Sequence, residues 1–192
     1  MARKTKVTDL NTIDLQKIRL SALDLQLRSL RFQAKALDSI ATEHTAGIKL
    51  RTSRYYDYLD RTVGRFVVRV KEFLTVVDTM PAEEACSWIA EMSAWKTTIV
   101  SQAEEQESFQ SNLAIARVKA DIAGRPVAPL DDIPSDFIGQ EVKAQSFCLT
   151  AEQAQLKTFS MQVAATCNLG MEIILSASSE AGKKRQTATK CS

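Results

Sequence analysis

Residues 11–44, with the sequence NTIDLQKIRLSALDLQLRSLRFQAKALDSIATEH, decide the fold of this chain. Apolar side chains recur along them at alternating intervals of three and four residues, which is the spacing of a coiled-coil seam on an α-helix. This first row comprises Ile13, Gln16, Leu20, Leu23, Leu27, Leu30, Ala34, Leu37 and Ala41. The pattern predicts a helix of about 50 Å, at 1.5 Å per residue.

A second apolar row lies on nearly the opposite face of the same predicted helix. It comprises Leu15, Ile18, Ala22, Leu25, Phe32 and Ala36. A helix that is apolar on two faces has to be covered on both. Either other helices of the same chain cover both rows, or one row packs inside the chain and the other contacts a second copy or a partner protein.

The second helical pattern extends from about Thr52 to Thr79. Its apolar row is one residue out of register with the first row, which predicts a break near Gly47 and an antiparallel hairpin of two helices. A single continuous helix with a four-residue insertion in its heptads is the alternative. The row comprises Tyr56, Leu59, Val63, Phe66, Val70, Phe73, Val77 and Met80.

A third helix is predicted to begin at Pro81, because proline followed by acidic residues is typical of a first helical turn. Trp88 and Trp95 at helical spacing within it predict a heavily packed contact, and we include them in a candidate protein–protein face. The apolar pattern is absent over residues 101–108. These residues are either a solvated middle turn of one long helix or a short break in it. Residues 124–135 contain three of the four prolines and predict a loop.

After this loop the sequence predicts a short helix over 136–147 and a separate last helix over 151–178. Thr150 followed by Gln153 is the pattern of a capping box at the start of that last helix. Gly170 interrupts the apolar row of the last helix. Since glycine destabilises a helix interior, it indicates a close helix crossing.

The two ends of the chain are polar and basic, and we predict disordered tails over 1–10 and 180–192. Residues 11–179 then form a single domain. The predicted fold class is all-α, an elongated bundle of about four long helices with coiled-coil-like packing.

The net charge of +2 hides a strong polarity along the chain. Residues 1–71 hold 15 Lys and Arg against 7 Asp and Glu, whereas residues 72–182 hold 6 against 16. The two halves either neutralise each other inside one folded chain, or help copies to associate and steer an anionic partner to one face.

Four cysteines lie far apart, without a C-x-x-C pair. We interpret Cys86, Cys148 and Cys167 as small buried thiols, not as disulfide or metal-ligating residues. Cys191 lies in the predicted tail, where we expect an exposed thiol that can cross-link.

Catalytic chemistry has little support in the sequence. The one histidine, His44, cannot supply a multi-histidine metal site within a single copy, and neither a Gly-rich phosphate loop nor a nucleophile elbow is present. We predict no enzyme activity, no cofactor and no metal site. No segment approaches the roughly 20 apolar residues of a membrane span or the core of a signal peptide. We therefore expect a protein that is neither secreted nor bound to a membrane, in the cytoplasm or in an assembled particle.

An arginine-rich strip occupies the face of the second helical pattern opposite its apolar row. It comprises Arg51, Arg54, Tyr58, Arg61 and Arg65, with Arg69 beside them. Guanidinium groups bind phosphate with paired hydrogen bonds, which suits a nucleic-acid backbone or an acidic protein surface. The simpler interpretation is a solvated strip or one paired with acidic residues of this chain.

These patterns predict a non-enzymatic helical subunit of a multi-copy assembly, such as a virion, that contacts other copies or a partner protein. The candidate contact residues are Leu15, Ile18, Leu25, Phe32, Trp88 and Trp95. The alternative is a nucleic-acid-binding helical protein, such as a DNA-packaging or nucleoprotein adaptor, that uses the arginine-rich strip.

Overall fold

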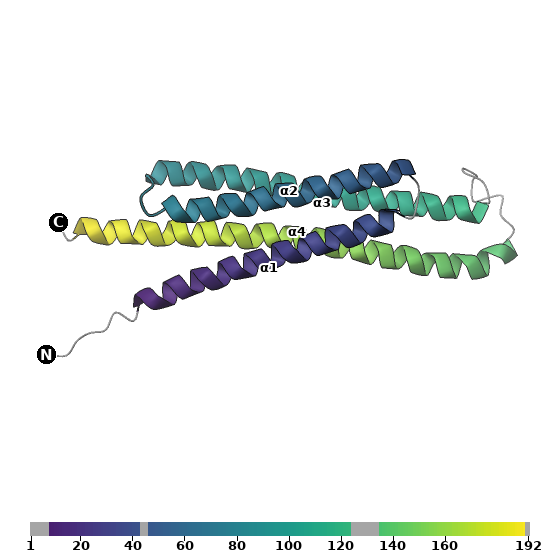
Figure 1. The fold of residues 1–192 in the computed structure, drawn as a ribbon, viewed down its shortest axis with the longest axis horizontal. Coiled ribbons are helices and arrows are strands. Elements are labelled where there is room, and N and C mark those ends of the chain that lie inside the picture. Colours follow the sequence, from purple (N-terminus) through teal and green to yellow (C-terminus); the bar gives the residue numbers. More distant parts are fainter. Residues whose placement is uncertain (1–7, 43–45, 124–134, 191–192) are drawn as a thin grey trace. The chain divides into compact units, whose positions relative to one another are not determined.

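The structure, a computed structural model, is all-helical over the residues that it describes, which confirms the all-α class. Backbone is described for residues 8–42, 46–123 and 135–190, and side chains for residues 15–39, 54–109, 111, 112, 115 and 153–188. These residues form α1 (Thr8–Thr42), α2 (Ala46–Val76), α3 (Ala82–Ala123) and α4 (Ser135–Lys190), as Figure 1 shows.

The chain divides into two compact units, and the division falls inside α3 and α4. One unit comprises Met1–Val100 and Gln162–Ser192, and the other comprises Ser101–Met161. The first unit therefore contains α1, α2, the first part of α3 and the last part of α4, and all of the candidate site residues. The single domain expected over 11–179 stays a prediction.

The core of the first unit is built from the rows that the sequence indicated. In α1 the buried members of the first row are Leu23, Leu27, Leu30, Ala34 and Leu37. In α2 all eight predicted members are buried: Tyr56, Leu59, Val63, Phe66, Val70, Phe73, Val77 and Met80. Removal of this apolar surface from water is the main term that holds the helices together.

α1 and α2 pack against each other as an antiparallel pair, so the predicted hairpin is confirmed. Two ion pairs join them: Lys71 Nζ lies 2.8 Å from Asp24 Oδ1, and Arg31 Nε lies 3.0 Å from Asp60 Oδ1. As the residue number rises along α1 it falls along α2. The break predicted near Gly47 is confirmed, because α1 ends at Thr42 and α2 begins at Ala46.

Several predicted helix ends are wrong, and α1 begins at Thr8 and not at Asn11. α3 continues through residues 101–108, which confirms the alternative of one long helix there and excludes a short break. α4 runs unbroken from Ser135, so the separate short helix over 136–147 and the start at Thr150 do not exist. Neither glycine nor proline occurs between residues 140 and 169, so nothing in the backbone chemistry stops α4 there.

The predicted disorder of residues 180–192 is wrong as far as Lys190, where α4 ends. Ala181 is buried, and Arg185 extends its guanidinium to the turn that joins α2 to α3. Its Nη2 donates to the backbone carbonyls of Val77, Asp78 and Met80. These carbonyls belong to the turn after α2, so the hydrogen bonds give them a partner and hold the end of α4 against this turn.

Gly170 marks a close approach of α4 to α2, as the sequence indicated. A Cβ atom added to it would lie 2.5 Å from Cε1 of Phe66 and 3.2 Å from Cγ2 of Val70. Phe66 and Val70 are fully buried, so neither side chain has free space to move into. Only glycine allows this contact between the two helices.

We predict that Gly170→Ala lowers the melting temperature, because overpacking costs about 1–3 kcal/mol whereas the gain in helix propensity is about 1 kcal/mol. Gly182, an exposed glycine of the same helix with no atom within 4 Å of an added Cβ, is the matched control. Gly182→Ala should raise the melting temperature by roughly 2–4 °C. Thermal unfolding followed by circular dichroism compares the two, and an equal rise in both variants would contradict the close approach.

Candidate functional site

The second apolar row of α1 is exposed. We call this face the outer row and define it as Leu15, Ile18, Ala22, Leu25, Ser29, Phe32 and Ala36, which follow one another at intervals of three and four residues. Its four large side chains are 55% (Leu15), 63% (Ile18), 68% (Leu25) and 75% (Phe32) exposed. The interpretation of α1 as a central helix covered on both faces by its own chain is therefore wrong.

Burial of the exposed outer row by a partner would contribute a large favourable free energy. Full burial of a Leu, Ile or Phe side chain is worth about 1.5–3 kcal/mol, so covering these four would contribute on the order of 5 kcal/mol. Single exposed apolar residues are ordinary on protein surfaces, whereas a larger contiguous apolar face is a candidate interaction site. The outer row is therefore the candidate site on α1.

Two cations flank the outer row on the side of α1 that faces α2. Arg28 and Lys35 are exposed, seven residues apart, and neither forms an ion pair within the described part of the chain. Arg28 lies one helical turn from Asp24 and from Arg31, the two residues that pair with α2. Sequence reasoning missed this pair, although its seven-residue spacing beside the apolar row was a usable signal.

The predicted arginine-rich strip is only partly free. Arg54, Tyr58, Arg61 and Arg65 are exposed along one face of α2, and we call these four residues the arginine strip. Neither Arg54 nor Arg65 forms an ion pair or hydrogen bond within the described residues. Arg61 donates from Nε to the backbone carbonyl of Asp57 at 3.1 Å, which leaves the rest of its guanidinium available. The side chain of Arg51 lies outside the described residues.

Arg69 does not belong to the free strip. Its guanidinium carbon lies 3.5 Å from the centroid of the Trp88 ring, and its nitrogens lie 3.2 Å from Glu72 and 3.5 Å from Glu91. A guanidinium stacked on an indole and paired with two carboxylates has its charge satisfied inside the chain. Arg69 therefore serves the contact between α2 and α3.

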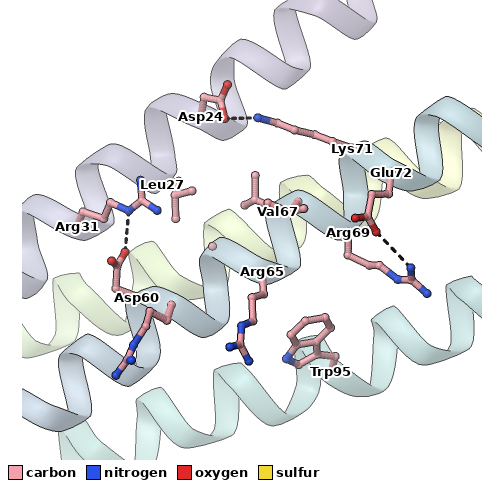
Figure 2. Close-up of a pocket in the computed structure, with 13 residues that line it drawn as sticks. Asp24, Leu27, Arg31, Asp60, Arg65, Val67, Arg69, Lys71, Glu72 and Trp95 are labelled. Carbon is pink, nitrogen blue, oxygen red and sulfur yellow. Dashed lines mark hydrogen bonds and ion pairs between the residues drawn. The ribbon is translucent and has the colours of Figure 1, made fainter.

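A groove of about 640 Å³ lies beside the strip, and Figure 2 shows its lining. Arg31 and Lys71 in this lining are paired with carboxylates across α1 and α2. In the same view Arg65 extends from α2 with no bond to any residue drawn. The groove is thus lined by cations that are paired with carboxylates and by two arginines of the strip, Arg61 and Arg65, that have no carboxylate partner among the described residues.

The two tryptophans pack within the chain. Trp95 contacts Phe66 with ring centroids 6.2 Å apart, and Trp88 contacts Phe73 at 5.9 Å. Both indoles are half-buried at the contact of α3 with α2. The heavily packed contact is confirmed, but the structure assigns it to the interior of one copy and does not leave the indoles as a free protein–protein face.

Among the described residues, no three or more His, Cys, Asp or Glu side chains gather where a metal ion would fit. Over the same part of the chain, none of the helices is long and apolar enough to cross a lipid bilayer. His44 lies outside the described residues.

The cysteines that the structure describes differ in environment. Cys167 is buried as predicted, and burial raises the pKa of its thiol to about 12. Burial likewise raises the pKa of the Tyr56 phenol, which is a core side chain. The prediction of a buried Cys86 is wrong, because this thiol is exposed one position after the buried Ala85. The side chains of Cys148 and Cys191 lie outside the described residues.

We expect a thiol reagent at about pH 7.5 to label Cys86 readily and Cys167 hardly at all. The thiolate is the reactive form, and a pKa of about 12 keeps Cys167 protonated until the pH approaches that value. Mass spectrometry of the tryptic peptides separates the two sites. In denaturant both should label alike, and equal labelling of the native protein would contradict the buried position of Cys167.

Comparison of the chain with protein-family models, with curated protein sequences and with solved structures finds no significant match.

Proposed function

We propose that this protein is a non-enzymatic helical subunit of a multi-copy assembly, and that the outer row of α1 makes its contacts with other protein chains. The observation that carries the proposal is the exposure of Leu15, Ile18, Leu25 and Phe32 on one face of a 35-residue helix. The assembly we propose is a virion or a similar particle. The protein would then act in the cytoplasm or within that particle.

The spacing of the outer row supports a helix as its partner. Residues at alternating intervals of three and four form the seam against which a second helix packs, with side chains of one helix inserted between those of the other. The polar Ser29 in the middle of the row is compatible with such a seam, in which a single polar position restricts the register. A partner helix would cover both Leu25 and Phe32 at once.

The proposal predicts a defined oligomer of the purified protein in light scattering at physiological salt. Leu25→Asp combined with Phe32→Asp should weaken association at least about 100-fold, because each substitution replaces an apolar contact worth about 1.5–3 kcal/mol. Both side chains are exposed within one copy, so circular dichroism should show an unchanged helical fold.

The control for this double variant is Val68→Asp, which places the same charge at an exposed apolar position of α2 outside the outer row. This control should keep the mass of the wild-type oligomer. A wild-type protein that stays monomeric at high concentration would overturn the proposal. So would an oligomer whose mass the double variant leaves unchanged.

The second candidate function is binding of a nucleic-acid backbone by the arginine strip. It is supported by Arg54, Arg61 and Arg65, which share one face of α2 and lack carboxylate partners among the described residues. These three side chains span about 16 Å of the helix at 1.5 Å per residue. Asp57 lies within this span and lowers the local positive charge, whereas Tyr58 adds a phenol that can donate to phosphate.

If the strip binds phosphates, the affinity for a DNA duplex should fall steeply between about 50 and 200 mM salt. Replacement of Arg54, Arg61 and Arg65 by alanine should then reduce the slope of log K against log salt by about 3, roughly one for each phosphate that is no longer neutralised. Fluorescence anisotropy with a labelled duplex measures both quantities.

A matched variant replaces Lys17, Lys157 and Lys183, three exposed cations at other positions, by alanine. It changes the net charge by the same amount and leaves the arginine strip intact. If the two triple variants lose affinity equally, binding depends on net charge alone and the strip has no specific role.

A further inference from the structure

The exposed face of α3 in the first unit is lined with small side chains. Ser87, Ala90, Ala94 and Thr97 follow one another at intervals of three and four residues, and all four are exposed. Large side chains on one helix pack well into the depressions that small side chains leave on another. The outer row of α1 carries large apolar side chains at the same spacing. These side chains are therefore suited to pack into the depressions between the small side chains of α3.

The edge of this α3 face is acidic where the edge of the outer row is basic. Glu84 and Glu91 are exposed and seven residues apart, as Arg28 and Lys35 are on α1. Glu84 forms no ion pair among the described residues, and Glu91 lies 3.5 Å from Arg69, a longer separation than that of Arg69 from Glu72. The two faces are therefore complementary in charge as well as in size.

Both charged edges lie on the side of their helix that faces α2. Glu91 approaches Arg69 of α2, while Arg28 is one turn from the residues of α1 that pair with α2. α1 and α3 run in the same direction, because each is antiparallel to α2; the ring contacts Phe66–Trp95 and Phe73–Trp88 fix this for α3. A second copy in the same orientation would thus bring its acidic edge onto the basic edge of α1.

We propose that the outer row of α1 binds the exposed face of α3 of a second copy of this chain, with Arg28 and Lys35 beside Glu84 and Glu91. This inference rests on the proposed function and names the partner. A contact between two different surfaces joins copies head to tail, so its repetition gives a closed ring or an open array.

Antiparallel pairing of α1 with α1 of another copy is less favourable. In a two-fold antiparallel pair the same edges of the two helices meet, which brings Arg28 and Lys35 of one copy against Arg28 and Lys35 of the other. Like charges at an interface disfavour it. The contact of α1 with α3 brings opposite charges together instead.

Charge reversal tests the inference in the full-length protein. Arg28→Glu with Lys35→Glu gives a chain whose two faces are both acidic at the edge, and Glu84→Lys with Glu91→Lys gives a chain whose two faces are both basic. Each double variant alone should associate at least about 10-fold more weakly than the wild type, since like charges now meet. An equimolar mixture should recover association, because the two variants can alternate in the array.

Analytical ultracentrifugation of each variant and of the mixture gives the readout, and thermal unfolding verifies that both variants are folded. One outcome supports the proposed function and contradicts this inference. In that outcome the wild type associates, the Leu25→Asp and Phe32→Asp variant does not, and the mixture of charge variants fails to associate. A wild-type protein that does not associate contradicts both the proposed function and this inference.

A second measurement does not depend on changed charges. A photoreactive phenylalanine analogue in place of Phe32, an exposed site, should cross-link to a peptide from residues 82–100 of another copy. Mixing isotopically heavy and light protein before irradiation distinguishes links between copies from links within one. Links from position 32 to α1 of the other copy would contradict the inference.

Discussion

The structure depends on one constraint: α1 is apolar on two faces, and its own chain covers only one. The buried face, with Leu23, Leu27 and Leu30, meets the rest of the first unit, while Leu25 and Phe32 point to solvent. The first row is held in place by the close packing of the core, and α2 and α4 approach so closely at Gly170 that no Cβ fits there. The buried face of α1 belongs to this core, and its other face carries the exposed outer row.

The charges around this surface are divided between structural and free roles. Lys71 and Arg31 join α1 to α2 through single carboxylates, and Arg69 joins α2 to α3 through an indole and two carboxylates. These pairs are at least partly exposed and contribute little each, but they fix which cations remain available. The described cations left without such partners include Arg28 and Lys35 at the edge of the outer row and the three arginines of the arginine strip. The two proposed activities use these two sets and are separable by mutation.

Local pattern was enough to predict the helical class, the α1–α2 hairpin and the whole buried row of α2. It failed where long-range contacts decide the outcome. Residues 180–190 have a composition typical of a disordered tail, yet α4 continues to Lys190 and Arg185 donates to carbonyls of the turn after α2. Cys86 adjoins Ala85 in an apolar stretch, but neighbours on a helix are about 100° apart and only Ala85 faces inward.

The candidate site was also predicted where local pattern decides and missed where contacts between helices decide. Periodicity found both rows of α1 but could not decide which partner covers the second, since that depends on how many helices surround α1. It also grouped Arg69 with the free arginines and the two indoles with the exposed apolar residues, because pairing with Trp88 or Phe66 is invisible in spacing alone.

The central claim is that another protein chain covers the outer row when the protein is at work. Hydroxyl-radical footprinting of Leu25 and Phe32 across a range of protein concentrations tests it most directly. Both side chains should be oxidised freely in dilute protein and become protected as the mass rises, while Val68 stays reactive throughout. Oxidation of Leu25 and Phe32 that is as fast in the assembled protein as in the dilute one would contradict the claim.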